Sequence, residues 1–140
     1  MNDLEPMGRD SIVRYVKELL PNPIREGEGL DGSMTLVGGD PGEVIVRITA
    51  DEVSVSVFSV RWEGPHTPRV FPQRLASLGW CHIPASSLMM SLHTLVDAAS
   101  ELRRESYSSC ERCGKTKPPE WMHGDSICQS CAERELGVVY

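Results

Sequence analysis

Four of the five cysteines form two closely spaced pairs near the end of the chain. The pairs are Cys110-x2-Cys113 and Cys128-x2-Cys131, and 14 residues separate them. Two cysteines three positions apart can bind one metal ion from adjacent corners of a tetrahedron, and two such pairs complete four-coordination. Because this spacing is typical of zinc-binding segments, we predict one structural Zn²⁺ ion held by Cys110, Cys113, Cys128 and Cys131.

Other chemistries remain open for the same four thiols. Iron in a rubredoxin-like site would favour a glycine after the second pair as well as the first, whereas Ala132 stands there. Redox-active dithiols are a further alternative. A catalytic metal is disfavoured because four thiolates leave no open coordination position. His123 could replace one cysteine, but four cysteines already suffice, and we expect His123 at the tip of a hairpin or in contact with a ligand.

The residues around the two pairs predict how the segment folds. Gly114 follows the first pair and can adopt a positive φ, which suits a knuckle whose backbone N–H groups face the sulfurs. A short helix is expected to begin at the second pair and to stop at Gly137. With a hairpin over 115–127 between them, the arrangement is of the treble-clef type. Trp121 is expected to pack within the small core of this segment.

Part of this segment resembles the GATA-type zinc finger. The resemblance rests on Cys110-x2-Cys113-Gly114, Thr116, Trp121 and Cys128-x2-Cys131, about 22 of the 140 residues. It implies a zinc fold with a helix at the second pair and, in that family, DNA contacts from the helix and a basic tail. The present loop is shorter, Met122 and His123 stand where the family tends to have arginines, and no basic tail follows Cys131.

The preceding residues are expected to form a separate α+β domain. We place this domain at 1–105 and the four-cysteine zinc module at 106–140, because about thirty-five residues alone bury too little apolar surface to fold without a staple. Hydrophobic periodicity and turn residues predict an antiparallel meander sheet with two helices. The patterns place helices at 10–20 and 85–104, strands at 33–37, 43–49, 53–62 and 69–71, and a flexible Gly-rich loop at 25–32.

The second helix is expected to present one apolar face to the sheet. Its members recur at helical spacing: Leu88, Leu92, Leu95, Val96, Ala99 and Leu102. The strand at 53–62 changes its inward face partway, which indicates a bulge near Val57–Phe58 or burial on both faces.

Charge and hydropathy restrict the kinds of partner that we expect. The formal net charge is −6, so the chain is not built for non-specific attraction to phosphate, which needs clustered Lys and Arg. No run of about 18 apolar residues predicts a membrane span, and the acidic, polar N-terminus carries no apolar signal-peptide core. We therefore expect a cytoplasmic protein without a membrane partner.

Two further motifs could carry function. Residues 61–74 interleave arginines with aromatic side chains. Such a pattern can bind single-stranded nucleic acid, or it can be a long loop packed on the sheet with solvated arginines. Because the chain is acidic overall, we favour contact with a protein partner, for which the candidates are Arg61, Trp62, Arg69 and Phe71, since Arg and Trp are favoured interface anchors. Cys81-His82, with His93 or Asp97 as helpers, would fit a thiol enzyme. A buried structural Cys81 is the simpler interpretation, because a nucleophilic thiol needs a base positioned in space.

The sequence thus favours a non-enzymatic interaction or adaptor protein with a structural zinc site. Its expected partner is a protein. A DNA-binding regulator, with Lys115, Lys117 and Arg134 on phosphates, is the first alternative, although the net acidity disfavours nucleic acid. A thiol enzyme centred on Cys81 is the second.

Overall fold

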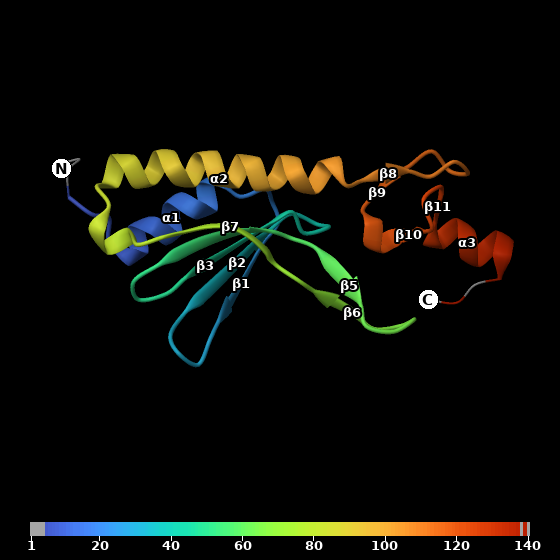
Figure 1. Ribbon diagram of the computed structural model, residues 1–140, viewed down its shortest axis with the longest axis horizontal. Helices are drawn as coiled ribbons and strands as arrows, with labels where there is room; N and C mark the ends of the chain where they lie inside the picture. Colours follow the sequence, from blue (N-terminus) through green and yellow to red (C-terminus); the bar gives the residue numbers. More distant parts are fainter. Residues whose placement is uncertain (1–4, 138, 140) are drawn as a thin grey trace.

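Two helices cover one face of a five-stranded antiparallel sheet (Figure 1). The computed structural model describes residues 5–137 and 139. Helix α1 (Arg9–Leu19) precedes the sheet and α2 (Ala85–Glu105) follows it. The fold is therefore α+β, a meander with two helices followed by a small C-terminal four-cysteine segment, as the sequence predicts.

The sheet has the strand order β1-β2-β3-β4-β7, and every neighbouring pair is antiparallel. The strands are β1 (Ile24–Glu28), β2 (Met34–Gly38), β3 (Val44–Ile48), β4 (Val53–Val57) and β7 (Gln73–Leu78). The predicted hairpin is β2–β3, joined by the turn at 39–43. Strands β1 and β7 form the two edges of the sheet.

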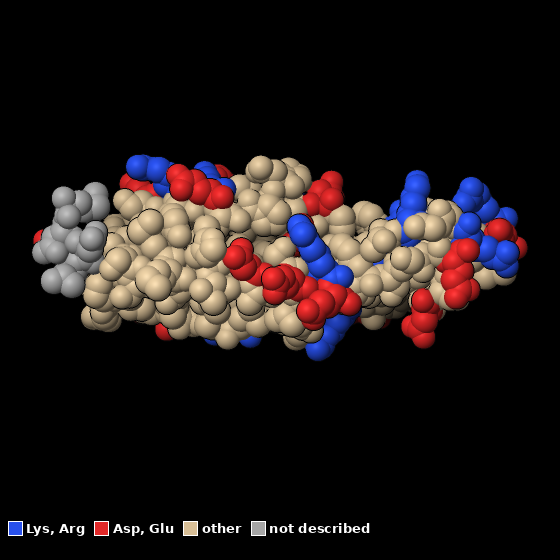
Figure 2. All heavy atoms as spheres, turned by 90° about the horizontal axis from the view of Figure 1, so that it is seen from above, with Lys and Arg blue, Asp and Glu red and all other residues tan. Residues whose placement is uncertain are grey.

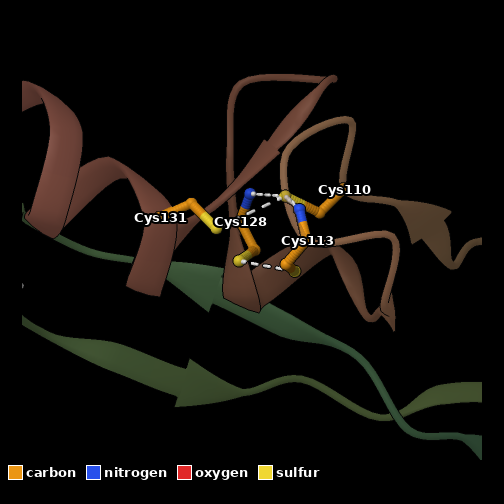
Figure 3. A group of neighbouring side chains, drawn as sticks. All are labelled: Cys110, Cys113, Cys128 and Cys131. Atoms are coloured by element: carbon orange, nitrogen blue, oxygen red, sulfur yellow. Dashed lines mark hydrogen bonds between the residues drawn. The ribbon is translucent and has the colours of Figure 1, made fainter.

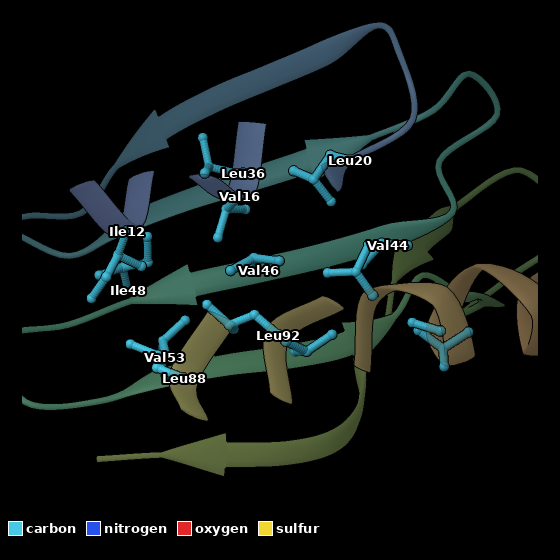
Figure 4. Packing of buried hydrophobic residues seen from close by; sticks show 14 residues of the cluster. Ile12, Val16, Leu20, Leu36, Val44, Val46, Ile48, Val53, Leu88 and Leu92 are labelled. Carbon is cyan, nitrogen blue, oxygen red and sulfur yellow. The ribbon is translucent and has the colours of Figure 1, made fainter. Parts of the chain in front are cut away.

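The core lies between the sheet and the two helices (Figure 4). In α1, Ile12 and Val16 are one helical turn apart and face inward, and Pro21 follows the helix end. The inward residues of β2, β3 and β4 alternate with outward ones, as the two-residue period of a strand requires. The sheet contributes Leu36, Val44, Val46, Ile48, Val53, Val55 and Val57 to this core.

The buried face of helix α2 differs from the predicted face at its C-terminal end. Leu88, Leu92, Val96 and Ala99 are buried as predicted, but the next buried residue is Arg103. Leu102 is 46% exposed. The steps of four, four, three and four residues keep position 103, and not 102, on the covered face.

Three strand predictions were wrong. The loop expected at 25–32 begins instead with β1, which pairs with β2 along its whole length. The single strand expected at 53–62 breaks at Phe58–Ser59 into β4 and β5 (Val60–Trp62), which forms a separate hairpin with β6 (Pro68–Val70). Strand β7 was not expected, and the register shift within its pairing with β4 lies between Val55 and Ser56.

The C-terminal segment consists of short elements. They are β8 (Ser108–Ser109), β9 (Thr116–Lys117), a 3-10 turn η2 (Pro119–Trp121), β10 (Met122–His123), β11 (Ile127–Cys128) and α3 (Gln129–Leu136). Strands β8 and β9 pair, and β10 and β11 form a second hairpin. The segment lies beyond the C-terminal end of α2 and beside the β5–β6 hairpin (Figure 1). The division at residue 105 stays a prediction.

Among the residues that the structure describes, no helix combines the length and the apolar character needed to cross a bilayer.

Candidate metal centre

The four paired cysteines converge from three different elements (Figure 3). Cys110 and Cys113 lie in the loop between β8 and β9, Cys128 ends β11, and Cys131 lies in the first turn of α3. Gly114 has φ +74°, which lets the chain turn back after the first pair, and its N–H donates to the carbonyl of Cys110 at 2.9 Å. The loop is therefore the knuckle that the glycine predicts.

Two of the sulfur–sulfur separations match the edge length of a tetrahedron around a metal ion. All four Sγ atoms lie within 4.8 Å of one another. The Sγ atoms of Cys110 and Cys131 are 3.7 Å apart, and those of Cys113 and Cys128 are 3.8 Å apart. A tetrahedral ion with metal–sulfur bonds of about 2.3 Å would separate its ligands by about 3.8 Å. The cluster could therefore hold a metal ion without rearrangement.

Backbone amides surround one sulfur in particular. The N–H groups of Cys113, Cys128 and Arg112 donate to the Sγ of Cys110 at 3.5, 3.3 and 3.4 Å. These N–H groups, that of Cys113 first, lower the pKa of Cys110 to about 6. The N–H of Cys131 is the main cause of the lowered pKa of Cys128. Both thiols are thus prepared for the deprotonated form that binds metal.

Cys131 differs from the other ligands in its surroundings. Burial raises its pKa to about 11, although the Arg134 guanidinium, 3.1 Å from its Sγ, acts in the opposite direction. A divalent cation would reverse this preference, because a metal-coordinated thiol is deprotonated.

A small apolar cluster surrounds the centre, but Trp121 does not belong to it. Cys110, Cys128 and Cys131 pack with Met122, and Ile127 covers them in part. Trp121 is exposed, and the Lys117 ammonium lies 5.4 Å from the centre of its ring. The expectation that Trp121 forms the core of the segment was therefore wrong. His123 lies on β10 opposite Ile127, outside the four-sulfur group.

One buried ion pair joins the C-terminal segment to the α+β part. Arg103 of α2 is 2% exposed, and both of its terminal nitrogens contact the carboxylate of Glu120 in η2, Nη1 to Oε1 at 3.0 Å and Nη2 to Oε2. Its Nε donates to the carbonyl of Gly42 at 2.9 Å. The guanidinium also lies 5.2 Å from the rings of Phe58 and Tyr107. The spacing of buried residues along α2 signals this position, but nothing local identifies Glu120 as the partner.

The predicted partner-contact residues lie on the β5–β6 hairpin. Arg61 and Arg69 are directly opposite in the ladder. The Arg61 guanidinium lies 3.7 Å from the centre of the Phe71 ring, and Arg69 pairs with Glu63 at 3.3 Å. Trp62 is exposed and, with Trp121, lines a pocket of about 360 Å³ between the hairpin and the C-terminal segment.

The residues suggested for thiol catalysis are distributed over two elements. Cys81 is half-buried in a 3-10 turn, η1 (Trp80–His82), where its Sγ lies 3.6 Å from the carbonyl oxygen of Ala50. His93 and Asp97 are exposed on α2 and contact each other at 3.6 Å. Cys81 is therefore only partly buried, in contrast to the expected buried position.

Comparison with known proteins identifies no relative. The chain gave no significant match to protein-family models, to curated proteins or to solved structures. What the site can do therefore has to be inferred from its own geometry.

Proposed function

We propose that Cys110, Cys113, Cys128 and Cys131 bind one structural Zn²⁺ ion, and that the protein is a non-enzymatic interaction protein. The observation that carries the zinc proposal is the pair of sulfur–sulfur separations, 3.7 and 3.8 Å, in a group of four thiols. Four thiolates fill the coordination shell of Zn²⁺, so no position is left for water or substrate. When bound, the ion supplies folding energy and a fixed tetrahedral junction.

The arrangement of elements supports a treble-clef type of module. A knuckle carries the first pair, the β10–β11 hairpin follows, and α3 carries the last ligand at its start. The N-terminal end of a helix carries positive partial charge, which favours the two negative charges of a Zn²⁺ ion with four thiolates. Ala132, which follows the second pair directly, is buried, whereas a rubredoxin-like iron site would favour glycine there.

Elemental analysis of purified full-length protein tests the metal. We expect one zinc per chain, and we expect Cys128→Ser to lose it. Cys81→Ser is the matched control, because Cys81 lies in η1, and it should keep full metal content. Iron in place of zinc, or metal-free protein that retains an ordered C-terminal segment, would contradict the proposal.

The contact surface proposed for the protein partner is the pocket between the β5–β6 hairpin and η2. Trp62 and Trp121 line it together with Pro68 and Val70, all of which are exposed. Tryptophan in a pocket is favoured at binding hot spots, since it buries a large apolar area while keeping one polar group. Arg61, Arg69 and Phe71 lie on the same hairpin and would form the rim of this surface.

Affinity purification with quantitative comparison of variants tests the surface. A genuine partner should be recovered by the wild-type protein and lost with Trp62→Ala and with the combined change of Arg61, Trp62, Arg69 and Phe71 to alanine. Met90→Ala is the control, because Met90 is a strongly exposed apolar residue of α2. If every captured protein survives the combined change, this surface is not the interface.

DNA binding is the second candidate, and the side chains suggested for it support it less well. Arg134 donates to the Sγ of Cys131, and Lys117 lies over the Trp121 ring. Both are thus already engaged within the segment. Binding to duplex DNA that weakens steeply with added salt would support DNA binding.

A further inference from the structure

The sheet face opposite the helices carries an unusual set of side chains. The strand register places Arg25, Val37, Ile45, Ser56 and Arg74 opposite one another across all five strands. The next outward row is Gly27, Thr35, Arg47, Ser54 and Ser77. Neither row contains an acidic residue, although the whole chain has a net charge of −6. This face therefore carries three arginines and several hydroxyl groups, with the Asp31 and Glu52 carboxylates beside it on Arg47 and Ser77.

A pocket of about 290 Å³ lies on this face. Arg47 and Arg74 line it from different strands, with Thr35, Ser54 and Ser56 between them. Ile45 and Pro72 add apolar surface. The pocket is larger than a single phosphate or carboxylate group. It could therefore also hold part of a ligand to which such a group is attached.

Two of the lining serines are largely buried, and their hydroxyls have no partner within the described part of the protein. Ser54 is 8% exposed and Ser56 is 6% exposed. Within residues 5–137 and 139, no hydrogen bond involves either hydroxyl. Ser77, in the same row as Ser54, instead donates to Glu52 at 3.0 Å. Neither serine oxygen is among the fully buried, unpaired polar atoms of the described residues, so both remain accessible from the pocket and can donate to a ligand.

The two arginines have unused donors. Arg47 contacts Asp31 at 3.2 Å through one terminal nitrogen, in a pair whose side chains are both largely exposed. A guanidinium has five N–H donors, so most of those of Arg47 remain available. Arg74 has no ion-pair partner among the described residues.

We infer that this pocket binds an oxyanion, a phosphate or carboxylate group, between Arg47 and Arg74. The guanidinium groups donate charge-assisted hydrogen bonds, and the planar fork of arginine matches both kinds of anion. The hydroxyls of Ser54 and Ser56 donate from the floor and thereby acquire the partner that they lack in the free protein. The site lies on strands of the sheet, so it does not depend on the metal centre.

Titration of the full-length, metal-loaded protein tests the site. Inorganic phosphate and acetate are added in separate NMR titrations at constant ionic strength, with chloride as the balancing anion. We expect saturable shifts in the amides of β4 and β7 with at least one of the two anions. Saturation by phosphate alone assigns a phosphate-bearing ligand, and saturation by acetate assigns a carboxylate. If neither anion gives saturation, the inference is wrong.

Matched variants separate a site from diffuse attraction. Arg74→Gln and Arg25→Gln each remove one positive charge from the same row, but only Arg74 lines this pocket. We expect Arg74→Gln to weaken binding about tenfold or more, because a charge-assisted hydrogen bond is lost, and Arg25→Gln to change it little. If both variants lose the same amount of anion affinity, the binding is general electrostatic attraction, and the inference of a specific site is wrong.

The serines provide a second test that uses stability as its readout. Ser56→Ala should weaken anion binding while leaving the melting temperature of the free protein unchanged or higher, because its hydroxyl has no partner to lose. Ser77→Ala should keep anion binding. A clear fall in the melting temperature of free Ser56→Ala would show that the hydroxyl has a structural role, which contradicts the inference.

Discussion

Tyr107 illustrates how one atom can oppose folding. Its ring packs beside Arg103, but its hydroxyl is buried without a hydrogen-bond partner among the described residues. Leaving a buried polar group unpaired costs about 1–3 kcal/mol. We expect Tyr107→Phe to raise the free energy of unfolding by about 1 kcal/mol, measured by urea denaturation. A destabilised variant would indicate a hydrogen bond to this hydroxyl.

The same residue predicts a loss of stability in alkali. Burial is the main cause that raises the pKa of Tyr107 above its ordinary value of 10.0. The folded state therefore favours the neutral phenol, so the associated stability is present below pH 10 and is lost as the pH rises through the folded pKa. Tyr107→Phe should show a smaller decline over this range. Parallel denaturation series above and below pH 10 measure the difference.

At the scale of elements, α2 and η2 are joined by one buried charge pair. Removing one partner of such a pair leaves the other charge buried and uncompensated, at a cost of about 3–5 kcal/mol. We expect Arg103→Met to lower the free energy of unfolding by about this amount. Arg104→Met is the control: Arg104 is exposed and contacts Glu43 at 2.8 Å, so its loss should cost about 1 kcal/mol or less.

Lysine should not replace Arg103. The guanidinium binds both oxygens of Glu120 and the carbonyl of Gly42 at once, and an ammonium lacks this planar fork. We expect Arg103→Lys to unfold at a urea concentration well below that of the wild-type protein. Wild-type stability in this variant would mean that charge alone, without the fork geometry, holds η2 on α2.

The elements differ in how far the sequence could predict them. The β2–β3 hairpin was predictable because Gly38-Gly39-Asp40-Pro41-Gly42 is turn chemistry between two β-branched runs. Strand β1 contains Gly27 and two glutamates, and it is a strand because β2 offers it a pairing edge. Strand β7, with the sequence QRLASL, has no β-branched residue and likewise depends on its neighbour. Such context overrides local propensity.

The candidate metal centre was more predictable than its placement. Ligand identity follows from cysteine spacing, which is local, and the sulfur group lies where the spacing requires. The position of the segment depends on Arg103 meeting Glu120, seventeen residues away in the sequence. No periodicity encodes such a pair. Trp121 was misassigned for the same reason, because the residues that surround it, such as Trp62 and Val70 of the β5–β6 hairpin, are distant in the sequence.

At the scale of the whole molecule, metal and core stability should be coupled. In the described part of the C-terminal segment, the apolar cluster consists of three cysteines and Met122, with Ile127 packed against them, so chelation should unfold the segment. Glu120 would then leave Arg103 unpaired against the sheet domain. We expect a strong chelator to lower the melting temperature of the entire chain, followed by amide exchange in β3 and β4. Unchanged protection in these strands would show that the two parts are independent.

The surface around the first half of α2 is uncharged and holds Met90, the control position for the affinity-purification experiment. Residues 75–96 contain no Asp, Glu, Lys or Arg. Figure 2 shows an uncharged area over the first half of α2, with charged side chains behind it along the upper edge of the view and others toward its second half and the C-terminal segment. Met90 is an exposed apolar residue that does not line the pocket of Trp62. A partner lost with Trp62→Ala but kept with Met90→Ala therefore binds at the pocket and not at exposed apolar surface in general.

The two edge strands determine how this molecule can meet others. An incoming β-strand at β1 would encounter Arg25, Glu26 and Glu28 within five residues, and one arriving at β7 would meet a strand whose register shifts between Arg74 and Ala76. Charges and irregular backbone are the usual deterrents to fibril growth by strand addition. Association by extension of the sheet is therefore disfavoured, and other molecules are expected to contact this protein through its side chains.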